Sequence, residues 1–206
     1  MNATTLDEIR AALTRRTPRP SGFHARGGRV WASVALVLAG EGAGLSLAMI
    51  RRAEREGDPW SGQMALPGGR ADPADADAAA VAERETQEEV GLRLRRDQLI
   101  APLEEMPVLR AGVDIGMVLA PHVYHLGVAP ARLVPSHEVA DAWWVPVPHL
   151  LQPAHATELF FTRDGQRLKF PGIAFGGQVI WGVTYRVLAA FFGVLGRDLP
   201  RPGARP

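Results

Sequence analysis

Three glutamates, Glu85, Glu88 and Glu89, stand at positions i, i+3 and i+4 of one segment, so a helix places them on one face. Carboxylates this close repel one another by a few tenths of a kcal/mol per pair. Mg²⁺ or Mn²⁺ offsets such repulsion, because both ions select oxygen ligands of high charge density. Arg84 adjoins Glu85 and precedes Glu88 by four residues, so it can brace a carboxylate from the flank. The alternative is a solvated acidic helix face, which is common in soluble proteins.

The residues upstream of the acids favour the metal interpretation. Pro67, Gly68 and Gly69 place flexible backbone before the acidic helix, which is predicted over residues 75–90 and ends at Gly91. The Gly69 carbonyl can join a metal shell, and backbone without side chains can approach a phosphate closely. The segment therefore predicts a divalent-metal site that acts on a phosphorylated ligand.

Residues 68–92 resemble the Nudix box. The family pattern is Gly, five residues, Glu, seven residues, then Arg-Glu-apolar-x-Glu-Glu-x-Gly-apolar. Residues 84–92, RETQEEVGL, match its second half, with Thr86 in the apolar slot. That half is highly specific, so the chain is identified as a member of the Nudix hydrolase family.

The first half of the box departs from the pattern in two ways. The spacing from Gly69 to Arg84 is one residue longer than standard. The first glutamate is missing, and Asp75 and Asp77 flank an alanine at that place. A longer box rich in Asp resembles the branch of coenzyme A pyrophosphatases. The missing glutamate leaves a metal-shell or orienting role without an assigned residue.

The resemblance implies roles for the box residues. Glu85, Glu88 and Glu89 would bind the divalent cations, with the Gly69 carbonyl as a further ligand, and Arg84 would orient Glu85. The family reaction is attack of a metal-activated water on a phosphorus of a diphosphate. Mg²⁺ or Mn²⁺ would lower the pKa of that water, neutralise phosphate charge and hold the attack in line.

A further acid is expected opposite the box, because many Nudix enzymes use one as a metal ligand or general base. Glu138, in the stretch HEVADAWWVP, is the candidate, and Asp141 and Glu158 are lesser ones. The alternative for Glu138 is an ordinary exposed loop acid.

The residues before the box partly resemble a second signature of coenzyme A pyrophosphatases. The glycines and proline of residues 62–69 fit it, with Leu66 in place of Phe, whereas the nearby arginines are out of register. Arginines here can grip a diphosphate or 3′-phosphate bidentately, or they form a surface basic cluster. The predicted substrate-binding residues are Arg51, Arg52, Arg55, Gly68 and Arg70.

Composition limits the other classes of function. The chain has 206 residues and a formal net charge of +1, which argues against broad capture of nucleic acid or anionic membrane. It contains no cysteine, which excludes a cysteine nucleophile or disulfide framework and fits a reducing cytoplasm. The first residues carry acids and no apolar h-region, so we expect a cytoplasmic protein without a signal peptide.

The elements that must position these residues follow from periodicity. One domain, 1–206, is expected, with a core over 30–195, an N-terminal helix and linker over 1–29 and a frayed tail over 197–206. The implied fold is the Nudix α/β/α sandwich, with a mixed sheet and the box as loop–helix–loop. Ala79, Ala82, Thr86 and Val90 form a small-residue stripe for packing on the sheet, with Glu83 and Gln87 left to solvent. Strands are predicted over 30–39, 45–52, 62–69, 99–109, 115–127 and 141–147, a hairpin around 164–165 and a last helix over 179–195.

The predicted activity is metal-dependent hydrolysis of a nucleoside diphosphate derivative. Coenzyme A or an acyl-CoA is the leading substrate, giving 3′,5′-ADP and a phosphopantetheine, whereas ADP-ribose, dinucleotides and nucleoside triphosphates stay open. A regulatory module that binds nucleotides without hydrolysis is the alternative class. The intact set of Arg84, Glu85, Glu88 and Glu89 argues against it. A homodimer is a further possibility that the sequence leaves open.

Overall fold

A computed structural model describes residues 4–16, 22–23, 29–110, 112–127, 131–163 and 165–203. Several residues of the N-terminal segment predicted over 1–29 lie outside these ranges, as do residue 164 at the predicted hairpin turn and the last three residues of the chain.

A mixed sheet forms the centre of the fold. Its main strands follow the order β3 (Met64–Ala65), β2 (Ser46–Arg52), β1 (Val30–Ala39), β7 (Val113–His125) and β5 (Leu99–Pro102). The pair β1 and β7 is parallel, and the other pairs are antiparallel. Three further strands join it: β4 (Gly68–Arg70) pairs with β1, β6 (Met106–Arg110) with β7, and β8 (Val139–Pro146) with β2.

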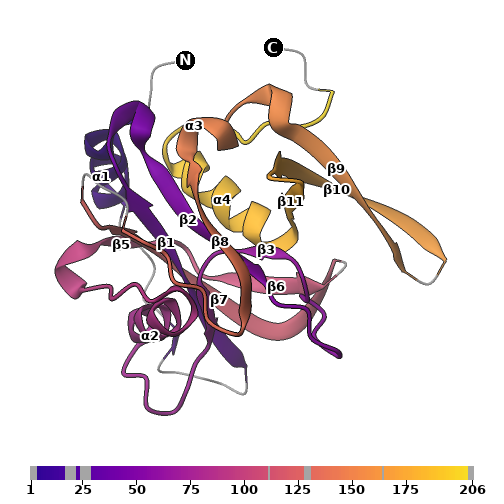
Figure 1. Cartoon of the computed structure of the whole chain (residues 1–206), viewed down its shortest axis with the longest axis horizontal. Helices are drawn as coiled ribbons and strands as arrows, with labels where there is room; N and C mark the ends of the chain where they lie inside the picture. The colour runs from indigo at the N-terminus through magenta and orange to yellow at the C-terminus, as the bar shows by residue number, and fades with distance from the viewer. Residues whose placement is uncertain are drawn as a thin grey trace.

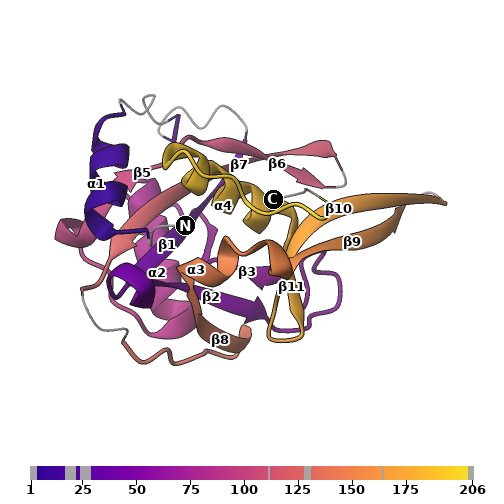
Figure 2. The ribbon, with the colours of Figure 1, turned by 90° about the horizontal axis from the view of Figure 1, so that it is seen from above.

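Helices cover both faces of this sheet, as Figures 1 and 2 show. Alternate side chains of β1 enter opposite layers, because successive residues of a strand point to opposite faces. Leu36 and Leu38 pack in the cluster that contains α1 (Leu6–Thr14) and α4 (Gly182–Val194), whereas Ala35 and Val37 pack in the cluster that contains α2 (Ala78–Val90). The predicted α/β/α sandwich is confirmed.

The segment before α2 differs from its prediction. A single strand was expected over 62–69, but the chain forms β3 on β2 and then β4 on β1. Pro67 lies between them; its carbonyl accepts from the Ala35 amide at 2.8 Å. The chain therefore crosses from one strand to the next, and Gly68 and Gly69 are strand residues of the central sheet.

Two other predictions need correction. The strand expected over 99–109 is divided into β5 and β6, with Leu103 buried between them. The start of the helix predicted over 179–195 is a strand, β11 (Gln178–Trp181), because its β-branched and aromatic residues extend the sheet of β10 (Gln166–Phe175).

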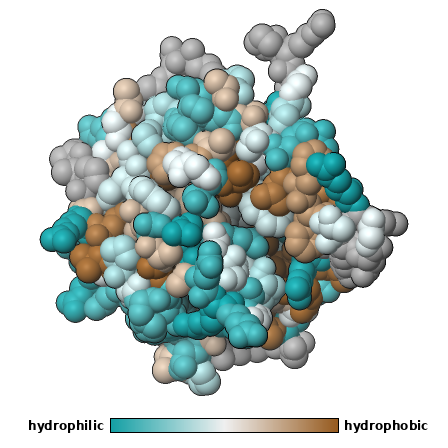
Figure 3. All heavy atoms as spheres, turned by 45° about the vertical axis from the view of Figure 1, so that its right-hand side comes forward, coloured by the Kyte–Doolittle hydropathy of each residue, from teal (hydrophilic) through white to brown (hydrophobic). Residues whose placement is uncertain are grey.

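A second sheet of β9 (Ala156–Arg163), β10 and β11 contains the predicted hairpin, which projects from the body in Figure 1. Phe160 and Phe161 of β9 are 49% and 39% exposed. Figure 3, which brings this side forward, shows hydrophobic patches separated by hydrophilic side chains.

The described part of the tail is packed rather than frayed. Leu199 belongs to the core cluster, and Arg197 lies 3.6 Å from Glu8 of α1. Short helices complete the description: α3 (Val147–Leu150) and the 3-10 turns Gly42–Gly44, Arg96–Gln98 and Pro153–His155. Among the described residues, no helix is both long enough and apolar enough to cross a bilayer.

Candidate active site

The helix α2 holds the three acids through its two caps and its small residues. The Asp77 side chain accepts from the Ala80 amide at the first turn, and Gly91 ends the helix in the left-handed conformation. The helix begins three residues later than predicted. Its predicted stripe, Ala79, Ala82, Thr86 and Val90, is buried, which leaves Glu85 partly exposed beside β4 and Glu88 exposed.

Glu83 is a correction to the predicted solvent face. Its carboxylate accepts from the Tyr124 hydroxyl at 3.0 Å and lies 2.9 Å from the Arg96 guanidinium. Only Gln87 of the predicted pair is exposed. Glu83 therefore ties α2 to β7 instead of serving the acidic face.

The two glycines of β4 let α2 come close to the sheet. The Gly68 amide donates to Glu89 Oε2 at 2.9 Å. A Cβ on Gly69 would lie 2.4 Å from the Glu85 carboxylate, closer than any side chain tolerates. Both carboxylates thus rest directly on strand backbone, an arrangement that side chains at these positions would prevent.

Arg84 connects the acids of the box. Its Nη1 lies 3.0 Å from both Glu85 Oε1 and Glu88 Oε2, and its Nη2 donates to the Arg70 carbonyl at 3.1 Å. Its Nε and Nη2 donate to the two oxygens of Asp75 at 3.1 and 3.0 Å. These bonds, with that of Asp75 foremost, raise the pKa of the Arg84 guanidinium above its ordinary value, so it stays charged.

The ion pair of Asp75 with Arg84 was not predicted from the sequence. Its side chain is 6% exposed and accepts from the Asp72 amide at 2.7 Å as well as from Arg84. It occupies the part of the box where the family's first glutamate is absent. An acid nine residues before the arginine was visible in the sequence, but the turn that folds it back was not.

Asp75→Asn should lower kcat by roughly tenfold to a hundredfold, the usual effect of losing a group that orients a ligand. The amide loses the charge and one acceptor, so Arg84 no longer holds a single orientation beside Glu85. The measurement is kcat under saturating metal, with Asp72→Asn as control, because the exposed Asp72 carboxylate accepts from the Ala74 amide instead of from Arg84. Equal activity of the two variants would contradict this role of Asp75.

Burial sets the electrostatics of Glu89. Its side chain is 4% exposed, and loss of solvent raises the pKa of this carboxyl from 4.5 to about 8. The Gly68 amide opposes that shift, the negative charge of Glu85 adds to it, and Arg52, 4.0 Å away, opposes it again. Burial also raises the pKa of Glu85, against the lowering effect of Arg84. A cation in contact with these groups would favour their charged forms.

The metal-free protein should therefore lose stability as the pH rises. Glu89 binds its proton more tightly in the folded chain than at its ordinary 4.5, so its contribution is full below that pH and is lost as the pH approaches 8. Between pH 5.5 and 8.5 the loss should reach up to about 3 kcal/mol. Urea denaturation of the wild type and of Glu89→Gln measures this decrease in the free energy of unfolding. The decrease should be smaller in the variant, and added Mg²⁺ should make it smaller in the wild type. Parallel pH dependences would contradict the assignment.

The predicted fourth acid lies near the others. Glu138 lines the same pocket as Glu85 and Glu89, and its negative charge contributes to the raised pKa of both. Its carboxylate pairs with Arg55 at 3.0 Å. The lesser candidates are engaged elsewhere: Asp141 pairs with Arg51 at 2.6 Å, and Glu158 with Lys169 at 2.5 Å.

The predicted arginines divide into two groups. Arg52, Arg55 and Arg70 line the pocket with Gly68, whereas Arg51 does not. Neighbouring side chains of a strand point to opposite faces, so Arg51 and Arg52 cannot both face the pocket. The prediction that Arg51 helps to form the substrate site is not supported by this placement.

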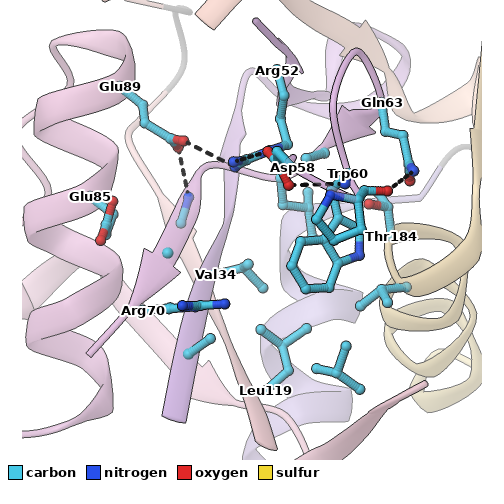
Figure 4. Close-up of a pocket in the computed structure, with 18 of the residues that line it drawn as sticks. Val34, Arg52, Asp58, Trp60, Gln63, Arg70, Glu85, Glu89, Leu119 and Thr184 are labelled. Carbon is cyan, nitrogen blue, oxygen red and sulfur yellow. Dashed lines mark hydrogen bonds and ion pairs between the residues drawn. The ribbon is translucent and has the colours of Figure 1, made fainter. Parts of the chain in front are cut away.

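The pocket is a cavity of about 480 Å³ between α2 and α4. Figure 4 shows Glu85 and Glu89 on one side and Trp60 and Thr184 on the other, with Val34 and Leu119 between them. Trp60 lies in a loop fixed by Asp58, which accepts from the Trp60 amide at 3.0 Å and from Arg52 at 2.9 Å. No motif in the sequence pointed to Trp60 or Asp58 as pocket residues.

The donor set suits a hard divalent cation. Four carboxylates lie at or beside one end of the pocket, those of Glu85, Glu88, Glu89 and Glu138, and oxygen ligands are those that Mg²⁺ and Mn²⁺ prefer. In the described residues, no three acidic or histidine side chains converge on one point, because Glu85 and Glu88 both turn to Arg84. The chemistry of these oxygen donors fits a divalent cation.

Comparison with known proteins places this arrangement in a family. Residues 28–162 match the family model described as the NUDIX domain, which includes the whole of β4 and α2. The chain belongs to the Nudix family. The match covers the central sheet together with Glu138, while α4, which forms the other wall of the pocket, follows it.

Curated relatives of this Nudix chain align over part of their length. It is 35% identical over 114 residues to the uncharacterized protein C14C4.10c of Schizosaccharomyces pombe, covering 54% of this chain and 35% of that protein. It is 33% identical over 128 residues to the mitochondrial coenzyme A diphosphatase NUDT8 of Homo sapiens, covering 60% and 51%. The chain thus spans about half or less of these two relatives.

A solved structure supports the fold across more of the chain. The MutT/nudix family protein from Enterococcus faecalis superposes with a TM-score of 0.58 at 16% identity, covering 92% of this chain and 69% of that one. At that identity the likeness shows the Nudix fold alone.

Proposed function

We propose that the chain hydrolyses the diphosphate bond of coenzyme A or an acyl-CoA, with Mg²⁺ or Mn²⁺, to 3′,5′-ADP and a phosphopantetheine. The observation that supports hydrolysis is that Arg84 pairs with Glu85 and Glu88 on the helix whose Glu85 and Glu89 line the pocket. A protein that only bound nucleotides would not need a charged arginine that holds two carboxylates beside a third.

The choice of coenzyme A is supported by the relatives. NUDT8 of Homo sapiens and, at 30% identity over 105 residues, NUDT7 of Mus musculus are named coenzyme A diphosphatases. The Asp-rich box and the glycines before it point to the same branch. The three arginines at the pocket supply cationic groups for a diphosphate, as bidentate donors.

Each residue has a proposed role in this reaction. Glu85, Glu88 and Glu89 hold the cations, with the Gly69 carbonyl as a further ligand, while Arg84 and Asp75 fix the orientation of Glu85. When bound, the metal supplies a water of lowered pKa and neutralises phosphate charge. Glu138 accepts the proton of the attacking water as its oxygen bonds to phosphorus and the bridging P–O bond breaks. Arg52, Arg55 and Arg70 bind phosphate oxygens.

Product analysis tests the proposal. The purified protein would be incubated with Mg²⁺ or Mn²⁺ and coenzyme A, acyl-CoA, ADP-ribose, NADH, diadenosine polyphosphates or nucleoside triphosphates. Metal-dependent release of 3′,5′-ADP, faster than any other product, is the expected result. Faster release of AMP from ADP-ribose or a dinucleotide would support diphosphate hydrolysis but overturn coenzyme A as the substrate. Tight ligand binding without any product would overturn the proposal that the chain is an enzyme.

A further inference from the structure

The pocket has two chemically different ends. One end carries the carboxylates of Glu85, Glu89 and Glu138. Arginine side chains lie beside these acids, which we call the arginine end: Arg52 lies 4.0 Å from Glu89, and Arg55 lies 3.0 Å from Glu138. The other end is apolar and lies against the first turns of α4. Its lining residues are Val108, Met117, Leu119, Val183 and Val187, with Trp60 as a wall.

Two polar side chains near the apolar end, those of Thr184 and Gln63, already donate to backbone carbonyls. The Thr184 hydroxyl donates to the Met64 carbonyl at 3.1 Å, and Gln63 Nε2 donates to the Pro59 carbonyl at 3.1 Å. A ligand group that needs several hydrogen bonds, such as a sugar hydroxyl or a purine edge, would lose water there without full replacement. Methyl and methylene groups lose no hydrogen bonds there, and burying their apolar surface is favourable.

The two halves of coenzyme A differ in the same way as the two ends. On one side of the diphosphate stands the pantoyl unit, whose dimethyl-substituted carbon is apolar and close to the phosphate. On the other side stands a ribose that carries a charged 3′-phosphate and adenine. A phosphate buried against Val108 and Val187 would be costly, whereas beside Arg52 and Arg55 it meets two guanidinium groups.

We propose that the pocket binds its substrate in one direction, with the pantoyl and pantetheine arm over the apolar end and the 3′-phosphorylated nucleoside at the arginine end. This inference rests on the proposed function. Val183 and Trp60 then determine specificity, because they contact the arm and not the reacting phosphorus. The same arrangement disfavours ADP-ribose, whose second sugar would place hydroxyls on the apolar end.

Product inhibition of coenzyme A hydrolysis tests the direction, since each product is one half of the substrate. Val183→Thr replaces a methyl by a hydroxyl of similar size on a partly buried helix position. It should raise the inhibition constant of 4′-phosphopantetheine about fivefold, the typical effect of a polar group in an apolar contact, and leave that of 3′,5′-ADP unchanged. Trp60→Ala should act in the same direction. Val113→Thr, the same change at a residue that is 53% exposed, is the control and should alter neither constant.

The outcomes separate this inference from the proposed function. Weaker inhibition by 3′,5′-ADP alone would place adenine at the apolar end and overturn the direction. Unchanged inhibition by both products would show that the arm does not contact Val183 or Trp60, which also overturns it. Absence of coenzyme A hydrolysis by the wild type would instead overturn the proposed function, and this inference with it.

Discussion

Glu88→Gln should lower kcat by about a thousandfold, equivalent to about 4 kcal/mol of transition-state stabilisation, with almost no change in stability. The side chain of Glu88 is 58% exposed and forms an i,i+4 ion pair with Arg84. Exposed pairs of this kind contribute only about 0.3–0.5 kcal/mol to folding. The change therefore removes a proposed metal ligand without disturbing the core, which the buried Glu89 would not permit.

The test measures kcat at saturating substrate over a titration of Mg²⁺, together with urea denaturation. Glu41→Gln is the matched control, because it removes the same charge from an exposed residue at the far end of β1. We expect the control to match the wild type in both measurements. Wild-type turnover by Glu88→Gln would show that Glu88 is not a metal ligand and would leave Glu85 and Glu89 as the ligands.

The sequence predicted those helices and strands whose conformation depends on residues close along the chain. The run of Val, Ala and Leu in β1 fits a strand buried on both faces, and its bounds agree with the structure. The small residues at helical spacing predicted the packed side of α2, and Gly91 its end. The acidic face follows from the same periodicity, so Glu85, Glu88 and Glu89, the three proposed metal-binding side chains, could be named from the sequence.

Contacts that depend on a change of chain direction were not predictable in this way. Asp75 reaches Arg84 only because the turn after β4 folds back, and Trp60 enters the pocket because Asp58 fixes its loop. The short apolar run of β11 fits either a strand or the first turn of a helix, and pairing with β10 decides between them. Sequence adjacency says nothing about which face of a strand each side chain occupies, so the sequence could not show that Arg52 lines the pocket and Arg51 does not.

Alanine at the two neighbouring glycines of β4 should affect different properties. At Gly68, φ is +151°, and a Cβ would lie 2.3 Å from the Ser33 carbonyl oxygen and 2.6 Å from Val34 Cα. These are backbone atoms of β1 that cannot move without disturbing the sheet. Gly68→Ala should therefore cost roughly 3 kcal/mol or more of folding free energy.

Gly69→Ala should instead abolish most activity while the fold persists. Its φ is not in the left-handed region, and the atoms that a Cβ would meet at 2.4 Å belong to the Glu85 carboxylate, which can rotate away. Displacing that carboxylate from Arg84 should lower kcat by about a hundredfold, because misplacement of about 1 Å at a reacting centre has this effect. Urea denaturation and kcat of both variants test the contrast. Full activity of Gly69→Ala would mean that Glu85 works from another position, and wild-type stability of Gly68→Ala would mean that β4 does not need its close approach to β1.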